Sequence, residues 1–212
     1  NANNINLMPI AFYVSEIWQH FMQDNLPILC FLREFLNNNP EITVLIKNPH
    51  INGIEYLLNL FNIKNKIIIT EKNNFTCKKL YKIHFNPNAT VYWWPPIFFN
   101  NCNSVFNIKN IIQNKLIYIT RNNVKVRKIT NESEVVDFLK HKALLLNLEF
   151  VYFNPEKYSM EQKHILFNEA KIVICPHGGA SLHMYFCKPK TLFIEICFIK
   201  TMHAHINIAL SI

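Results

Sequence analysis

Short apolar runs alternate with stretches of helical periodicity along most of the 212 residues. The apolar runs predict strands at residues 42–46, 66–70, 90–94, 115–120, 150–153, 171–175 and 191–196. Amphipathic spacing and capping signals predict helices at residues 16–35, 54–61, 104–114, 135–141, 159–170 and 180–186. Alternating strands and helices are typical of α/β proteins with parallel sheets. The pattern therefore predicts an α/β fold with two Rossmann-like halves, residues 1–105 and 106–212.

Local signals refine three of these helices. Pro27 is expected to break or kink the first helix, because proline lacks a backbone N–H. The segments Asn-Glu-Ser-Glu at residues 131–134 and Ser-Met-Glu-Gln at residues 159–162 resemble capping boxes. Each of these two segments is therefore predicted to begin a helix.

Two of the three glycines are neighbours, Gly178 and Gly179, in the segment Cys-Pro-His-Gly-Gly-Ala-Ser-Leu at residues 175–182. The predicted strand 171–175 comes before them and the predicted helix 180–186 comes directly after them. This arrangement directs backbone N–H groups and the positive end of a helix dipole to one place, which suits a phosphate. The alternative interpretation is a tight turn that binds no ligand.

Half of the residues are hydrophobic and 17% are charged, which is typical of a globular chain with a sizeable core. The formal net charge is +8, and most lysines are scattered singly, unlike the basic stripe of a nucleic-acid groove. The charge therefore favours an anionic ligand, with polyanion binding as the minor alternative. The sequence has only two aspartates, Asp24 and Asp137, so no metal cofactor is expected.

Arg121 and Arg127 are two of only three arginines, against nineteen lysines, and both follow the predicted strand 115–120. A guanidinium group binds a diphosphate through paired hydrogen bonds, so these arginines indicate such a ligand. The alternative is a solvated basic loop. His177 precedes the glycine pair beside the same predicted ligand, although a lone histidine is often structural. Glu195 ends the last predicted strand and suits a ribose diol; the alternative is a buried acid with a lysine or backbone N–H partner.

His20 and Asp24 are spaced i, i+4 on one face of the first predicted helix. The pair suits a general base, and the alternative is a hydrogen bond on the helix surface. Another alternative is a zinc site, although the spacing of its candidate ligands matches no common zinc module. These candidates are Cys175, His177, His183 and Cys187. The six cysteines and three N-glycosylation sequons leave the cellular compartment open.

Together these segments resemble glycosyltransferase family 61. The resemblance rests on residues 18–27, 116–121, 127–132, 167–182, 186 and 191–196. It implies a GT-B fold and an inverting, metal-independent transfer of a sugar from a nucleotide-sugar donor, UDP-linked, to a hydroxyl of a protein or glycan. It also implies roles for individual positions: Asp24 or His20 as catalytic base, Arg121 and Arg127 on the diphosphate, His177, Gly178, Gly179 and Ala180 lining it, and Glu195 near the nucleoside.

The resemblance makes residues 1–105 the acceptor-side half and residues 106–212 the nucleotide-sugar-binding half. The family normally continues with further helices after the segment ending at Ile196, so the C-terminal half is expected to be truncated. Donor and acceptor are the expected partners, without nucleic acid. A membrane anchor, if there is one, is expected outside this chain, and the secretory pathway is the expected location in a eukaryote. Two alternatives stay open: a non-catalytic family member that binds nucleotide or a partner, and a basic nucleic-acid-binding α/β protein.

Overall fold

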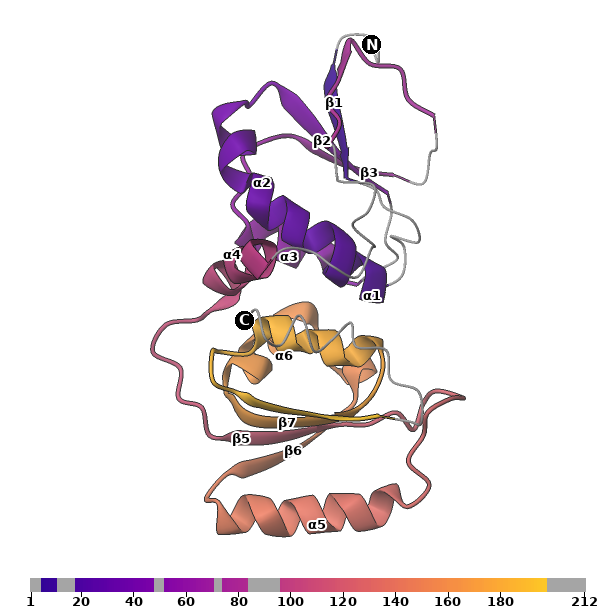
Figure 1. Cartoon of the computed structure of the whole chain (residues 1–212), viewed down its shortest axis with the longest axis vertical. Helices are drawn as coiled ribbons and strands as arrows, with labels where there is room; N and C mark the ends of the chain where they lie inside the picture. The colour runs from indigo at the N-terminus through magenta and orange to yellow at the C-terminus, as the bar shows by residue number, and fades with distance from the viewer. Residues whose placement is uncertain (1–4, 11–17, 48–51, 71–73, 84–95, 198–212) are drawn as a thin grey trace. The chain divides into compact units, whose positions relative to one another are not determined.

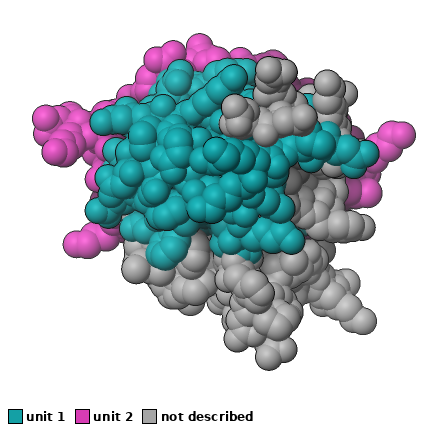
Figure 2. All heavy atoms as spheres, turned by 90° about the horizontal axis from the view of Figure 1, so that it is seen from above, with its two compact units in different colours: residues 1–105 teal, residues 106–212 magenta. Residues whose placement is uncertain are grey.

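A computed structural model describes residues 5–10, 18–47, 52–70, 74–83 and 96–197 of the chain. The chain divides into two compact units, residues 1–105 and residues 106–212, which Figure 2 colours separately. Each unit is built on its own sheet of parallel strands (Figure 1). The predicted α/β class with two Rossmann-like halves is therefore confirmed. Within the described ranges, no helix combines the length and the apolar character needed to cross a membrane.

The described sheet of unit 1 has four parallel strands in the order β3-β2-β1-β4. These strands are β1 (Asn6–Ile10), β2 (Ile42–Lys47), β3 (Ile67–Thr70) and β4 (Lys79–Leu80). The helical elements are α1 (Trp18–His20), the π-helical turn η2 (Phe21–Asn25), α2 (Leu26–Asn38), α3 (Ile54–Leu60) and α4 (Pro96–Phe106). The first turns of α2 bury Leu26, Ile28 and Leu29 completely. This apolar face accounts for the helical periodicity of that segment.

Two sequence predictions fail, one in unit 1 and one at the boundary between the two units. Pro27 does not break the helix, because it occupies the first turn of α2, where the absence of an N–H is tolerated. The helix predicted at residues 104–114 is also wrong, since α4 begins at Pro96 and ends at Phe106. Turn and irregular backbone follow α4 up to the next strand. The strand predicted at residues 90–94 lies outside the described residues.

The described sheet of unit 2 also has four parallel strands, in the order β6-β5-β7-β8. They are β5 (Lys115–Ile119), β6 (Glu149–Phe153), β7 (Ala170–Pro176) and β8 (Leu192–Ile196). The helical elements are α5 (Glu132–Leu145), η3 (Pro155–Lys157), α6 (Met160–Asn168) and the 3₁₀ helix η4 (Gly179–Phe186). The two long helices α5 and α6 cover opposite faces of this sheet (Figure 1). Strand β5 is consequently buried from Leu116 to Ile119, as expected of a parallel strand between two helical layers.

Helix α6 begins at the capping box that the sequence predicts. The Ser159 hydroxyl accepts a hydrogen bond from the Gln162 N–H, and the Gln162 side chain accepts one from the Ser159 N–H. The helix then buries Phe167 beside Phe153 of β6, with ring centroids 5.0 Å apart. This packing holds α6 on the sheet and brings the start of β7 next to β5.

Candidate functional site

The order of strands in unit 2 defines a switch point between β5 and β7. From β5 the chain proceeds to β6 on one side, whereas β7 pairs with the other side of β5. Open α/β sheets bind ligands beyond the carboxyl ends of their strands at such a point. Arg121 lies two residues after β5, and His177 follows directly on β7. The topology therefore brings together two segments that the sequence singles out separately.

Arg121 and Gly178 are in close contact at this switch point. A Cβ atom built on Gly178 would lie 1.9 Å from Nη1 of Arg121 and 2.8 Å from its Cζ. Only glycine leaves room for the guanidinium group in this position. The reason for a glycine here is thus the close approach of a side chain, in addition to the turn that the sequence predicts.

The Arg121 side chain is held in place without a full set of hydrogen-bond partners. Its Nε–H is buried and has no hydrogen-bond partner among the described residues. Burial, and then the positive charge of Arg127, lower the pKa of the Arg121 guanidinium. A buried donor without an acceptor costs about 1–3 kcal/mol, and more when it is charged. An anion that binds here would supply the missing acceptors and relieve the repulsion between the two arginines.

Arg127 is an exposed residue of the loop between β5 and α5. Its φ angle is 58°, in the left-handed region that residues other than glycine adopt uncommonly. The described residues form no ion pair between a carboxylate and either Arg121 or Arg127. Two guanidinium groups therefore act on each other at one end of the sheet, which is a suitable arrangement for a ligand with two negative charges.

The turn at Gly178 is stabilised from within. The Ser181 hydroxyl donates to the Gly178 carbonyl over 2.6 Å, and the Ser181 N–H donates to the same oxygen over 2.9 Å. Helix η4 begins at Gly179, so its first turn points its N-terminal end to the side of the sheet where Arg121 lies. The predicted glycine turn and helix start are both found, and the helix is of the 3₁₀ type.

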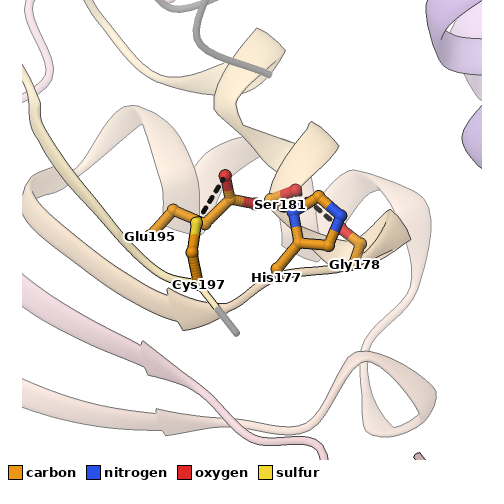
Figure 3. Close-up of polar contacts among 5 residues, drawn as sticks. All are labelled: His177, Gly178, Ser181, Glu195 and Cys197. Atoms are coloured by element: carbon orange, nitrogen blue, oxygen red, sulfur yellow. Dashed lines mark hydrogen bonds and ion pairs between the residues drawn. The ribbon is translucent and has the colours of Figure 1, made fainter. Parts of the chain in front are cut away.

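His177 and Glu195 are hydrogen-bonded to each other at the ends of β7 and β8 (Figure 3). Nδ1 of His177 donates to Oε1 of Glu195 over 2.9 Å, and the two side chains are 14% and 12% exposed. Strand pairing fixes this contact, because the His177 N–H also donates to the Ile196 carbonyl over 2.9 Å. The described partner of Glu195 is thus a histidine, which neither of the alternatives raised from the sequence includes.

Cys197 completes a small group with this pair. Its Sγ lies 3.9 Å from Oε2 of Glu195 (Figure 3). Slight desolvation, and then the charge of Glu195, raise the pKa of the exposed Cys197 thiol. The ligand atoms of His177, Glu195 and Cys197 all lie within 4.8 Å of one another, which makes them the metal-binding candidate among the described residues. Sequence reasoning missed Cys197, because it considered the cysteines of the strand and helix instead.

A buried carboxylate supports the strand end that carries Arg121. Oε1 of Glu132 accepts hydrogen bonds from the hydroxyls of Tyr118 (3.0 Å) and Thr120 (2.7 Å). Its Oε2 lies 3.0 Å from the Tyr152 hydroxyl and also accepts from Nδ2 of Asn122. Burial, followed by the interaction with Glu132, raises the pKa of the Tyr118 hydroxyl, which keeps it a donor. This network fixes both neighbours of Arg121 in the chain.

The same carboxylate corrects a sequence prediction. Residues 131–134 do not form a capping box, since the Asn131 side chain makes no capping hydrogen bond. Nδ2 of Asn131 instead donates to Oε2 of Glu134 over 3.2 Å. Helix α5 still begins at Glu132, whose side chain turns inward to the strands. Glu132 in the first turn of α5 therefore helps to position Arg121, through Thr120 and Asn122, in addition to beginning the helix.

The comparison with protein families agrees with the residues brought together here. The family model described as Glycosyltransferase 61 matches residues 18–194. The chain belongs to glycosyltransferase family 61. No curated protein matches the chain. The match includes both arginines and the glycine turn, and it ends one residue before Glu195.

The other predicted site residues of this glycosyltransferase lie in unit 1. His20 ends α1, and Asp24 lies within the π-helical turn that follows it. Such turns occur frequently at functional sites. The buried Gln23 and Asn25 flank Asp24 in the same turn. The proposed role of His20 and Asp24 as catalytic base stays a prediction, as do the acceptor and donor roles of the two halves.

The zinc site considered from the sequence is wrong for the described residues. His183 is a core histidine, since its ring stacks on Phe167 at 4.9 Å and its Nδ1 donates to the Ala180 carbonyl over 2.6 Å. Burial lowers its pKa to about 3. Cys175 and Cys187 are buried, and burial raises the pKa of both thiols. In the described structure the four side chains do not gather as ligands.

Proposed function

We propose that this glycosyltransferase moves a sugar from a UDP-linked donor to a hydroxyl of a protein or glycan acceptor, with inversion and without a metal ion. The observation that carries the proposal is the contact of Arg121 with Gly178 at the switch point of unit 2. Among the described residues the buried Nε–H of Arg121 has no acceptor, and the charge of a second guanidinium group repels it. The diphosphate of a nucleotide sugar would satisfy both groups.

The proposed transfer is a single displacement at the anomeric carbon. A base, Asp24 or His20 oriented by it, removes the proton of the acceptor hydroxyl, whose oxygen then forms the new bond to the sugar. The bond from the sugar to the diphosphate breaks, and its electron pair leaves with the nucleoside diphosphate. Negative charge therefore develops where Arg121, Arg127 and the start of η4 would stabilise it. Fixed donors of this kind typically contribute about 3 kcal/mol each, roughly a hundredfold in rate.

The charges available at the proposed site support the proposal of metal independence. The two arginines would neutralise a diphosphate in the way that a divalent cation does in other enzymes. The metal-binding candidates His177 and Glu195 are already paired with each other. We therefore propose that the two arginines, rather than a metal ion, stabilise the negative charge of the leaving diphosphate.

Calorimetry and a transfer assay test the proposal together. Wild-type protein should bind UDP in EDTA with an affinity that changes less than about twofold when Mn²⁺ replaces EDTA. A panel of UDP-sugars should show hydrolysis or transfer, with an inverted anomeric product identified by NMR. An absolute requirement for Mn²⁺ would contradict metal independence, and a retained configuration would contradict the single displacement. UDP binding without turnover of any sugar would instead support a non-catalytic family member.

A further inference from the structure

Two buried cysteines of unit 1 face each other across two helices. Cys30 lies on α2 and Cys102 on α4, separated by 72 residues, and their Sγ atoms are 2.9 Å apart. Their side chains belong to the core, with 6% and 0% exposure. All six cysteines lie within the described residues, and these two bring their sulfur atoms into direct contact. The pair is therefore a specific feature of this fold.

The separation of the two sulfur atoms is too short for ordinary packing. Non-bonded heavy atoms in protein cores are typically about 3.5–4.0 Å apart. A covalent S–S bond is about 2.0 Å long, so the sulfurs lie nearer to bonding distance than two independent side chains would. We propose that Cys30 and Cys102 form a disulfide that fastens α4 to α2.

The position of this bond gives it a structural purpose. Helix α4 is the last element of unit 1, at the boundary between the two units after Val105. Helix α2 continues directly from the turn that contains Asp24. A covalent link between these helices would close a long loop of chain, which is the situation in which a disulfide restricts the unfolded state most.

The surroundings of the two thiols indicate how the bond forms. A groove of about 390 Å³ between residues of α2 and α4 is lined by Cys30, together with Arg33, Glu34, Asn101 and Ser104. Burial and the neighbouring Cys102 raise the pKa of the Cys30 thiol, and the charge of Arg33 opposes that rise. Cys30 is thus the thiol that an oxidant in the groove meets first, whereas Cys102 is completely enclosed.

The bond requires a disulfide-type oxidant, such as oxidised glutathione or a protein disulfide oxidoreductase. The Cys30 thiolate attacks a sulfur of the oxidant and forms a mixed disulfide, which releases one thiol. The Cys102 thiolate then displaces the second thiol and closes the Cys30–Cys102 bond. The two cysteines lose two protons and two electrons in total, and the oxidant leaves as two thiols.

Mass spectrometry of the unmodified chain tests the inference directly. The protein is refolded in a glutathione redox buffer, its remaining thiols are blocked with iodoacetamide in denaturant, and it is digested without reductant. The expected result is a cross-linked pair of peptides from α2 and α4, with Cys30 and Cys102 protected from alkylation. Full alkylation of both cysteines, or a link between other cysteines, would overturn the inference. This measurement requires no variant.

Thermal unfolding with and without reductant gives the second readout. Reduction should lower the midpoint of the wild type by roughly 5–15 °C, given the length of the closed loop. Cys102→Ser should unfold at the lower midpoint in both conditions. Cys77→Ser is the matched control in the same unit, because it removes a half-buried cysteine outside the pair and should keep the full response to reductant. A wild-type unfolding midpoint that is the same with and without reductant would contradict the disulfide.

Discussion

Arg121 occupies the space where any side chain at Gly178 would begin. A Cβ at Gly178 would lie 1.9 Å from Nη1 of Arg121, a distance that real Cβ atoms do not show. The obstacle is the far end of a long side chain, which can move without disturbing the backbone. The glycine is therefore required both by the position of the guanidinium group and by its own φ of 159°, which other residues rarely adopt.

Gly178→Ala should weaken ligand binding and also lower stability. The new methyl group displaces the Arg121 guanidinium, so we expect the affinity for UDP to fall about tenfold to a hundredfold, the loss of one or two hydrogen bonds to a charged group. The midpoint of thermal unfolding should also fall, because alanine at a φ of 159° is strained. Calorimetry and a thermal melt of the same preparation measure both. Unchanged affinity would show that this contact plays no part in binding.

A double-mutant cycle assigns the effect to the pair. In the Arg121→Ala background the Gly178→Ala substitution should cost much less affinity than in the wild type, because the displaced group is absent and only the strain at a φ of 159° is left. Additive losses would mean that the methyl group acts on the turn itself. The four affinities of the cycle, measured under one buffer condition, distinguish these outcomes.

Among the cations of the loop that follows β5, Arg121 and Arg127 should contribute most to the turnover rate. Arg121→Ala and Arg127→Ala are each expected to lower kcat about a hundredfold, because each removes a cation that stabilises the leaving diphosphate. Lys125→Ala is the matched control, since it removes an exposed cation from the same loop. Initial rates of sugar transfer or hydrolysis measure the difference. Equal rates for Arg127→Ala and Lys125→Ala would contradict a specific role for Arg127.

The fold of unit 2 is largely predictable from local pattern, and that of unit 1 is less so. Strands β5, β7 and β8 are apolar runs with clear boundaries, which the periodicity identifies. Strand β1 is not predicted from the sequence, because it contains Pro9 and proline is unusual within a sheet. The proline is tolerated because β4 pairs only with Asn6 and Leu7, so one side of β1 has no β4 partner at that position. Which residues of a strand are paired depends on the tertiary fold, so local sequence pattern does not reveal it.

The candidate site also combines features that local sequence predicts with features that depend on the tertiary fold. The glycine turn, the arginines and the start of η4 carry local signals, so the sequence identifies each of them. Their proximity follows from the strand order β6-β5-β7-β8, which pattern alone does not specify. The role of Glu132 is missed because its partners come from two strands, while its local sequence resembles a helix cap. Long-range polar networks of this kind leave no periodic signal.

Glu132 should be a stability determinant of unit 2. Glu132→Ala removes the acceptor of the buried Tyr118 and Thr120 hydroxyls, so we expect a loss of about 3 kcal/mol or more in the free energy of unfolding. Tyr118→Phe should cost only about 1 kcal/mol, because one donor is removed without leaving a charge alone. Urea unfolding of the two variants measures both values. Glu134→Ala, an exposed acid of the same helix turn, is the control. A cost for Glu132→Ala no greater than the control would refute the role.

The His177–Glu195 pair should act through position rather than charge. Glu195→Gln keeps an oxygen that accepts the hydrogen bond from His177, so donor affinity should stay within about threefold of the wild type. Glu195→Ala releases the imidazole and should lower affinity about tenfold, the value of one hydrogen bond. Cys197→Ser should be neutral, because its sulfur contact is long. Calorimetry with UDP ranks the three variants. A loss in Glu195→Gln as large as in Glu195→Ala would show that the negative charge itself is needed.

His183 should make unit 2 sensitive to acid. Burial lowers its pKa from 6.5 to about 3, so the folded state keeps the ring neutral while the unfolded chain binds a proton below pH 6.5. The unfolded state therefore holds more protons between pH 6.5 and 3, and stability falls as the pH falls, by up to about 1.4 kcal/mol per pH unit. His183→Phe keeps the stacking on Phe167 and should flatten this part of the profile. Hydrogen exchange of the β5 amides at pH 4–7 reports on unit 2 specifically. The exposed His141→Gln is the control, and a slope in His183→Phe equal to that of the wild type would exclude His183 as the cause.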